Sequence, residues 1–519
     1  MMITKNGIEL SAGTVVATTR GSVRGTVEDG IHVFRGIPYA EPPVGPLRFR
    51  PPRARDRWDG VLGASRFGER HLQDYDPIEA RLMAGPERPP GGDDCLSLNV
   101  WTPDPTAAGL PVLVWIHGGS LKFGTGADAL YDGATFARDG VVTVTFNYRL
   151  HPAGFLWVGD RPGSGAFGLL DQIAVLEWVQ DNIATFGGDA GRVTVAGESA
   201  GAHSVGSLLA APRARGLFRR AILQSGAAAY ELPVAVSEVI GREVLRRVGI
   251  ERPDDEALAS IDSAALLDAA RDVEGRMGDV VAAAGMRPTL MGVITGVHSM
   301  PTCGADILPG PALDAVAAGA ARDVELLIGT TLDETTLFPP GWVERAQAVA
   351  EAAYAGSGRG PAEVLAAYRR NAPGGTELDG RTRLLTDALF RVPAIQLADA
   401  ARAHSPAVWM YLLTWASPPS DRGLGAFHGL DLPFMWKRVD GVADPFAELA
   451  GRPLSVDLAE AMHGAWAEFV RTGVPRHPRL PLWPGYDPTR RATMLLDDPG
   501  RVVDDPLGEE RRLWDGVRY

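Results

Sequence analysis

The chain is organised around one stretch, Arg192-Val193-Thr194-Val195-Ala196-Gly197-Glu198-Ser199-Ala200-Gly201. Its first half carries β-branched residues in the manner of a strand, its second half reads Gly-x-Ser-x-Gly, and small residues then open a helical segment. In a tight strand-to-helix turn a serine projects its hydroxyl outward, and flanking glycines avoid the clashes that side chains would cause. An ordinary Gly-Ser loop is the alternative interpretation. The strand before the motif and the helix after it favour Ser199 as a nucleophile.

Length and composition indicate a globular protein. The 519 residues are 45% hydrophobic and 22% charged, which is enough apolar material for a large buried core. We find no linker between independent cores, and we therefore expect a single domain over residues 1–519 with insertions near 70–93 and 232–300. The net charge of -13 argues against nucleic acid or an anionic membrane surface as a partner. The sequence does not decide the oligomeric state.

Cysteine content and hydropathy bear on the cellular compartment. Cys95 and Cys303 are the two cysteines of the sequence, too few for a disulfide framework. The N-terminus lacks the apolar run of a signal peptide, and no uninterrupted apolar stretch approaches the roughly 20 residues of a membrane span. We therefore expect a reduced, cytoplasmic protein that does not associate with a membrane.

Short apolar runs alternate with helical periodicity along most of the chain. Residues 14–37 predict a small antiparallel meander, and later strands and helices are predicted at regular intervals. The strands are expected at 95–101, 111–116, 141–148, 192–198, 221–226, 324–330 and 407–413, and helices at about 168–187 and 455–471. This order is typical of a doubly wound α/β fold, whose functional sites gather at the carboxyl ends of the strands.

A serine hydroxyl needs a base within hydrogen-bonding reach, because it is a poor nucleophile at neutral pH. In folds of this class the acid and then the histidine follow the serine in the chain. Asp333 and Glu334 come directly after the strand expected at 324–330. The downstream histidines are His404, His428, His463 and His477. His428 has the small neighbours that a closely approached catalytic loop needs, but spacing alone leaves the choice open.

The turn His117-Gly118-Gly119 follows the strand expected at 111–116. Attack on a carbonyl creates an oxyanion, and backbone N–H groups of a glycine turn can stabilise it without obstruction by side chains. The turn is similar to the HGG-type turn of esterases and lipases. A plain turn at the end of a strand is the alternative.

Taken together, the motifs identify a family. The chain resembles the type-B carboxylesterases, which include bacterial para-nitrobenzyl esterases, animal carboxylesterases and cholinesterases. The matching stretches are FRGIPYAEPPVGPLR (34–48), DCLSLNVWTP (94–103), 117–119, 147–156, 168–201, RRAILQSG (219–226), GTTLDE (329–334), 428–434, WAEFVRTGVP (466–475) and LPLWPGYD (480–487). The resemblance therefore covers nearly the whole chain.

The resemblance implies an α/β-hydrolase fold, with a central, mostly parallel sheet flanked by helices and helical insertions over the site. It implies a serine carboxylesterase that acts on a small-molecule ester, and we expect neither a metal nor an organic cofactor. Carried over by position, the roles are Ser199 as nucleophile, His428 as base, Glu334 as acid, the N–H groups of Gly118, Gly119 and Ala200 as oxyanion donors, and Glu198 and Ser225 as hydrogen-bonding supports.

The sequence departs from the family pattern at four positions. Many members pair the cysteine equivalent to Cys95 with an upstream cysteine that this chain lacks. Ser120 replaces the third glycine of the oxyanion turn, which is expected to narrow that pocket. Thr335 follows the acid where glycine is usual, so the orientation of Glu334 is less strongly implied. Cys303 replaces an aspartate far from the motifs, and we expect it to serve packing.

The substrate pocket is the least constrained part of the prediction. Four methionines lie among glycines between about 270 and 300, and a flexible, polarizable methionine wall suits small to medium apolar esters. We therefore hypothesise that Met286, Met291 and Phe338 line the pocket. The alternative is that the methionines fill gaps in an inserted helical segment.

Two other functions stay open from the sequence. A lipase, amidase or carbamate hydrolase would use the same fold and triad, because neither determines the leaving group. A non-catalytic binding protein is known on this fold, but such members lose the serine. The presence of Ser199, Glu334 and His428 favours a catalyst.

Overall fold

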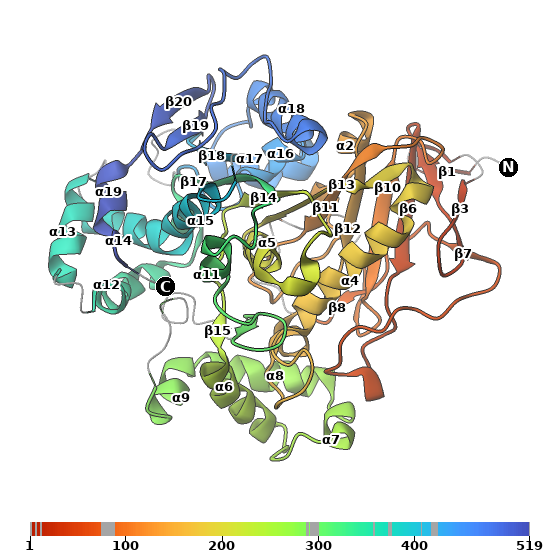
Figure 1. Ribbon diagram of the computed structural model, residues 1–519, viewed down its shortest axis with the longest axis horizontal. Coiled ribbons are helices and arrows are strands. Elements are labelled where there is room, and N and C mark those ends of the chain that lie inside the picture. Colours follow the sequence, from red (N-terminus) through yellow and green to blue (C-terminus); the bar gives the residue numbers. More distant parts are fainter. Residues whose placement is uncertain are drawn as a thin grey trace.

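The apolar runs assemble into a central sheet, as the computed structural model shows (Figure 1), and eleven of its strands lie in the described part of the chain. The structure describes residues 3–5, 8–10, 13–73, 82, 89–286, 290, 300–355, 359–371, 376–405, 407–416 and 424–517. The strands of this sheet, in spatial order, are β20 (Arg501–Asp504), β19 (Ala492–Leu496), β18 (Val408–Leu413), β17 (Glu325–Thr331), β14 (Arg220–Gln224), β13 (Gly188–Glu198), β11 (Leu110–Ile116), β12 (Val142–Phe146), β10 (Ser97–Thr102), β6 (Ile31–Pro38) and β5 (Thr26–Glu28).

The centre of the sheet is parallel, and its two ends are antiparallel. Neighbouring strands from β12 through β11, β13, β14, β17 and β18 to β19 run in one direction. β10, β6 and β5 pair antiparallel at one end, and β20 pairs antiparallel at the other. The predicted doubly wound arrangement is therefore confirmed for the central strands.

Both faces of the sheet are buried, and alternate residues of each strand point to opposite faces. On β11, Val112 and Val114 belong to one apolar core, whereas Leu113 and Trp115 belong to the other. The first core includes residues of three helices, α4 (Phe167–Asn182), α5 (Ala200–Ala210) and α15 (Val392–Arg402). The second includes residues of four others, α2 (Ala134–Arg138), α16 (Leu432–Met435), α17 (Asp444–Ala450) and α18 (Val456–Thr472). Because both faces are covered, the strands read as continuous apolar runs.

The helices divide into those that cover the sheet and two peripheral groups. The covering helices are α2 (Ala134–Arg138), α3 (His151–Phe155), α4 (Phe167–Asn182), α5 (Ala200–Ala210), α11 (Ala312–Ala317), α15 (Val392–Arg402), α16 (Leu432–Met435), α17 (Asp444–Ala450) and α18 (Val456–Thr472). At the lower edge of Figure 1 lie α6 (Val234–Arg247), α7 (Asp255–Ala259), α8 (Ser263–Glu274) and α9 (Met277–Ala283). At its left lie α12 (Ala346–Tyr354), α13 (Pro361–Asn371), α14 (Glu377–Thr386) and α19 (Gly508–Leu513).

In the described part of the chain, short strands form four small sheets beside the main one. They are β1 (Ile3–Lys5) with β2 (Ile8–Leu10), β3 (Val15–Ala17) with β4 (Ser22–Arg24) and β7 (Val61–Gly63), β8 (Arg70–His71) with β9 (Gly91–Gly92), and β15 (Leu232–Pro233) with β16 (Thr302–Cys303). The single meander predicted over 14–37 is wrong in one respect: β3 and β4 pair in a separate sheet, whereas β5 and β6 join the main sheet.

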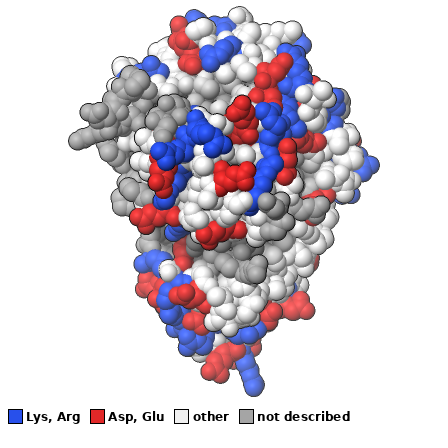
Figure 2. All heavy atoms as spheres, turned by 90° about the vertical axis from the view of Figure 1, so that its left-hand side faces the viewer, with Lys and Arg blue, Asp and Glu red and all other residues white. Residues whose placement is uncertain are grey.

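Acidic and basic side chains are interleaved on the face shown in Figure 2. Ion pairs within single helices also bring opposite charges together, for example Arg381 with Glu377 on α14 and Arg242 with Glu238 on α6. The net negative charge is thus not gathered into one acidic patch on that face. Among the described residues, no helix is both long and apolar enough to cross a membrane.

Candidate active site

Ser199 stands at the turn between β13 and α5, and its backbone is strained. Its φ and ψ are 55° and −124°, values rare for a residue with a side chain and typical of functional turns. A Cβ on Gly197 would lie 2.4 Å from the carbonyl carbon of Gly201, and a Cβ on Gly201 would lie 2.1 Å from the carbonyl oxygen of Ile116. The two glycines are therefore required for the chain to turn this tightly against β11.

His428 and Glu334 form a buried pair at the same edge of the sheet. Nδ1 of His428 lies 2.6 Å from Oε2 of Glu334. The other oxygen, Oε1, accepts the backbone N–H of Thr331 at 2.8 Å, so both oxygens of the acid are held. Because the carboxylate accepts a hydrogen bond from Nδ1–H, it orients the imidazole so that the base nitrogen is Nε2.

The second imidazole nitrogen faces another carboxylate. Nε2 of His428 lies 3.2 Å from Oε1 of Glu198, and among the described residues no hydrogen bond joins His428 to Ser199. Catalytic hydrogen bonds are commonly long or misaligned before substrate binds. In this state the imidazole is held between two carboxylates.

Burial and charge set the protonation of this group. Burial disfavours the charged imidazolium, but the neighbouring charges of Glu198 and Glu334 outweigh it and raise the pKa of His428 to about 9. Burial also raises the pKa of Glu198 to about 8, against the opposing attraction of His428. Because the charge of each group shifts the pKa of the other, His428 and Glu198 titrate as a coupled pair.

The predicted oxyanion donors lie beside Ser199. A Cβ on Gly118 would lie 3.2 Å from Cβ of Ser199, and Gly119 has a φ of 104°. Among the described residues, no hydrogen bond engages the N–H groups of Gly118, Gly119 or Ala200. Ser120, which replaces the usual third glycine, has a φ of 53°, so it keeps a left-handed backbone despite its side chain.

The acid and the histidine lie on two loops that are bonded to each other. The N–H of Asp333 donates to Ala426 O at 2.9 Å, and Oδ2 of Asp333 accepts the N–H of Ala426 at 3.0 Å. The hydroxyl of Thr336 donates to Leu424 O at 2.6 Å. Asp333, the alternative acid in the sequence, thus binds the histidine loop and not the imidazole.

A buried polar cluster, Asp431 with Gln224, Tyr411 and Trp466, lies behind the site. Gln224 and Tyr411 donate to Oδ2 of Asp431 at 2.9 and 2.8 Å, and Trp466 donates to Oε1 of Gln224 at 3.0 Å. Burial raises the pKa of Asp431 to about 6. Sequence reasoning missed this cluster; the one signal was an acidic residue three positions after His428 in an otherwise apolar segment.

Other predicted residues have varied surroundings. The hydroxyl of Thr335 donates to Thr382 O on α14 at 2.8 Å, so it is bonded away from the carboxylate of Glu334. Ser225 is buried, but its hydroxyl has no hydrogen-bond partner among the described residues. His404 binds Ala317 O on the surface, and His463 binds Met435 O and Asp139.

The candidate pocket residues are only partly placed. The ring of Phe338 lies 5.4 Å from the imidazole of His428, centroid to centroid. Met286 is half-buried against the main apolar core, and Met291 lies outside the described residues. Phe338 therefore lies at the site, whereas the role of the methionines stays a prediction.

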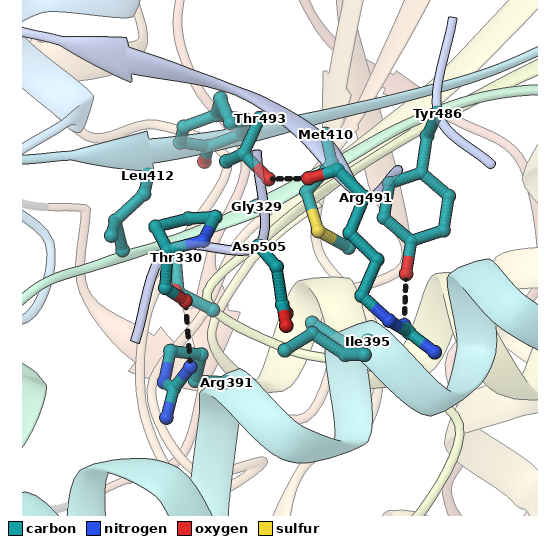
Figure 3. Close-up of a pocket in the computed structure, with 13 residues that line it drawn as sticks. Gly329, Thr330, Arg391, Ile395, Met410, Leu412, Tyr486, Arg491, Thr493 and Asp505 are labelled. Atoms are coloured by element: carbon teal, nitrogen blue, oxygen red, sulfur yellow. Dashed lines mark hydrogen bonds between the residues drawn. The ribbon is translucent and has the colours of Figure 1, made fainter. Parts of the chain in front are cut away.

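A separate cavity lies between α15 and strands β17 to β19 (Figure 3). Its walls include Thr330, Arg391, Ile395, Met410 and Arg491, and its volume is about 30 Å³. That is room for about two water molecules. The cavity is too small for an ester, and neither Ser199 nor His428 lines it.

Comparison with known proteins agrees with this geometry. The model of the carboxylesterase family matches residues 12–514. The para-nitrobenzyl esterase of Bacillus subtilis is 37% identical over 506 residues, covering 96% of this chain and 98% of that protein. The phenmedipham hydrolase of Pseudarthrobacter oxydans is 35% identical over 94% of this chain and 96% of its own.

Solved structures give the same result. A thermophilic para-nitrobenzyl esterase superposes with a TM-score of 0.83 at 34% identity, covering 96% of this chain and 99% of its own. A carboxylesterase of Geobacillus stearothermophilus superposes with a TM-score of 0.80 at 37% identity, covering 96% and 100%. The expected α/β-hydrolase fold is confirmed.

Proposed function

We propose, from the premise that this chain belongs to the carboxylesterase family and hydrolyses carboxylic esters, that the reaction proceeds through an acyl-enzyme on Ser199. The observation that carries the proposal is the 2.6 Å contact between His428 and Glu334 at the sheet edge where the strained Ser199 turn lies. A base oriented by a carboxylate next to a serine on such a turn is the arrangement that activates a hydroxyl.

The reaction has two stages, acylation of Ser199 and hydrolysis of the acyl-enzyme, and His428 transfers a proton in each. His428 takes the proton of Ser199 as Oγ attacks the ester carbonyl carbon, and the N–H groups of Gly118, Gly119 and Ala200 stabilise the oxyanion. As the bond from the carbonyl carbon to the alcohol oxygen breaks, His428 gives its proton to the departing alkoxide. His428 then takes a proton from water as the water oxygen attacks the acyl carbon. The bond from that carbon to Oγ of Ser199 breaks, His428 returns the proton to Oγ, and the carboxylic acid leaves.

We propose small to medium apolar esters as substrates. The ring centroids of Phe338 and Phe390 lie 5.4 and 4.7 Å from that of the His428 imidazole. The part of the ester that binds beside the imidazole therefore contacts aromatic side chains. The name of the relative from Bacillus subtilis states a para-nitrobenzyl ester, which supports an apolar aromatic group. Amide hydrolysis by the same site is the competing possibility, and paired ester and amide substrates with identical acyl groups separate the two.

The nucleophile is tested by Ser199→Ala. Loss of the nucleophile is expected to lower ester turnover by a factor on the order of 10⁶ with an unchanged thermal midpoint. Ser260→Ala, which removes an exposed hydroxyl from the residue that follows α7, is the control and is expected to keep full activity. A phosphonate inhibitor is expected to label Ser199, and an adduct on another serine would overturn the assignment.

A further inference from the structure

A π-helical turn, Asp387–Arg391, connects α14 and α15. The N–H of Val392 donates to Asp387 O, five residues earlier. Pro393 follows in the first turn of α15, and a proline cannot supply the next α-helical N–H. Such turns insert one residue into a helix and are frequent at functional sites. Here the turn contains Phe390.

Phe390 lies against the catalytic imidazole. Its ring centroid is 4.7 Å from that of His428, and the side chain is 5% exposed. The ring is nearly parallel to that of Phe338, at 7° and 6.2 Å. Both rings also contact His428 at similar inclinations, 37° and 38°. The imidazole therefore has aromatic surface beside it in addition to the two carboxylates at its nitrogens.

A buried polar network holds the turn. The Arg391 guanidinium donates to both oxygens of Asp387, at 2.6 and 2.5 Å. Tyr368 of α13 donates its hydroxyl to Oδ2 of Asp387 at 2.5 Å, and Nε1 of Trp514 donates to the Tyr368 hydroxyl at 2.6 Å. The turn that contains Phe390 is thus tied to α13 and to the end of the chain.

The other side of the turn is not tightly packed. Arg391, Ala394 and Ile395 border the 30 Å³ cavity of Figure 3, so on this side they adjoin space that protein atoms do not fill. The network around Asp387 therefore has to fix the turn against this space.

We propose that Phe390 is a positioning residue for His428 and that the Asp387–Arg391–Tyr368 network fixes Phe390 in place. The ring restricts rotation of the imidazole, so that Nδ1 keeps its bond to Glu334 while Nε2 moves between Glu198 and Ser199. This inference rests on the proposed role of His428 as the base. A loosened ring leaves Nε2 misdirected for part of the time, which lowers kcat more than it raises KM.

The test is Phe390→Leu, which removes the ring and keeps most of the volume. With para-nitrophenyl acetate as probe, kcat is expected to fall about tenfold or more, equivalent to about 1.4 kcal/mol, with KM changed less than about threefold. Phe390→Tyr keeps the ring and is expected to restore most of the kcat. Tyr368→Phe removes the hydroxyl that donates to Asp387 without altering Phe390 itself, and it is expected to lower kcat by a smaller factor.

The control is Phe136→Leu, because Phe136 is fully buried and its ring lies 4.4 Å from the imidazole of His463, away from the site. Similar loss of thermal midpoint in the two leucine variants, with kcat lowered only in Phe390→Leu, supports the proposal. Wild-type kcat in Phe390→Leu, or a change confined to KM, overturns it. Activity in Ser199→Ala would instead refute the proposed function, so the two failures are distinguishable.

Discussion

In the proposed mechanism, the protonation state of His428 decides whether Ser199 can be activated. Its imidazole lies between Glu334 at 2.6 Å and Glu198 at 3.2 Å, and both carboxylates favour the protonated ring. A protonated imidazole cannot accept the proton of Ser199. The pKa of His428, raised to about 9, therefore predicts that kcat/KM still increases with pH above neutrality, beyond the ordinary value of about 6.5 for histidine.

Glu198→Gln tests this account of the pH dependence. Removing one negative charge destabilises the imidazolium, so the pKa of His428 falls and the rising limb of kcat/KM moves to lower pH by about one to three pH units. The measurement is a kcat/KM profile from about pH 5 to 10. Glu177→Gln, which removes an exposed partner of Arg213, is expected to leave the limb unmoved. A limb at the same pH in Glu198→Gln would refute the charge effect.

At the scale of elements, the site depends on the pairing of two loops. Asp333 follows β17, and its carboxylate accepts the N–H of Ala426 two residues before His428. Asp333→Ala leaves this N–H without its acceptor, at a cost of about 1.5–3 kcal/mol, and lets the histidine loop move away from Glu334. We expect kcat to fall about tenfold or more along with the thermal midpoint.

Asparagine at position 333 supplies the matched control. Its amide oxygen can accept the same N–H, so Asp333→Asn is expected to retain most of the kcat. If alanine and asparagine lower kcat equally, the charge of Asp333 and not its hydrogen bond is responsible.

The sequence predicted the central elements because their signals are local. The strands at 111–116 and 192–198 appear as β11 and β13, and the late helix appears as α18 (Val456–Thr472). The sequence did not predict β19 and β20, which follow a Pro- and Trp-rich region. β19 forms by pairing with β18, which is distant in the chain, and β20 then pairs with β19. The π-helical turn was not predicted either, because a single turn of this kind leaves no hydrophobic periodicity in the sequence.

The candidate site, like the fold, was predictable only where its residues form local motifs. Ser199 and the glycine turn could be predicted because each lies in a contiguous motif. The choice of His428 as the base, among four histidines, needed the family resemblance. The Asp431 cluster and the Asp387–Arg391 pair could not be read from the sequence, since their partners Tyr411 and Tyr368 come from other elements.

The insertion that contains α9 offers a test of the pocket hypothesis. Replacing Met286 and Met291 by alanine is expected to change the ranking of acyl chain lengths if these side chains line the pocket, because each removes a flexible apolar wall. Rates with para-nitrophenyl esters of increasing acyl length give the ranking. An unchanged ranking with a lower thermal midpoint would assign the methionines to packing, and Ser199 would be unaffected.

At the scale of the whole molecule, the site is assembled from parts far apart in the chain. Gly118, Ser199 and Glu334 follow the central strands β11, β13 and β17, and His428 comes after β18 in the chain. Trp514 donates to Tyr368, which donates to Asp387 in the turn that contains Phe390. Such dependence on distant segments is what a single cooperative domain predicts. The organisation of residues 1–519 as one domain stays a prediction, and one thermal transition shared by activity and spectroscopy is its expected signature.

The buried ion pair of Arg149 and Asp171 is expected to be the strongest electrostatic support of this assembly. Three N–H groups of Arg149 donate to Asp171 at 2.7–3.0 Å, and Nη1 donates to Arg50 O at 2.8 Å, which joins the N-terminal segment to β12's loop and α4.

Asp171→Ala leaves the Arg149 guanidinium buried without its counterion, and we expect the free energy of unfolding to fall by about 3–5 kcal/mol. Arg149→Met combined with Asp171→Leu removes both charges and is expected to cost less than Asp171→Ala alone, because no unpaired charge remains. Chemical denaturation measures both. Glu177→Gln breaks a surface pair worth about 0–1 kcal/mol; a loss no larger than this in Asp171→Ala would show that water or the loop relaxes to solvate Arg149.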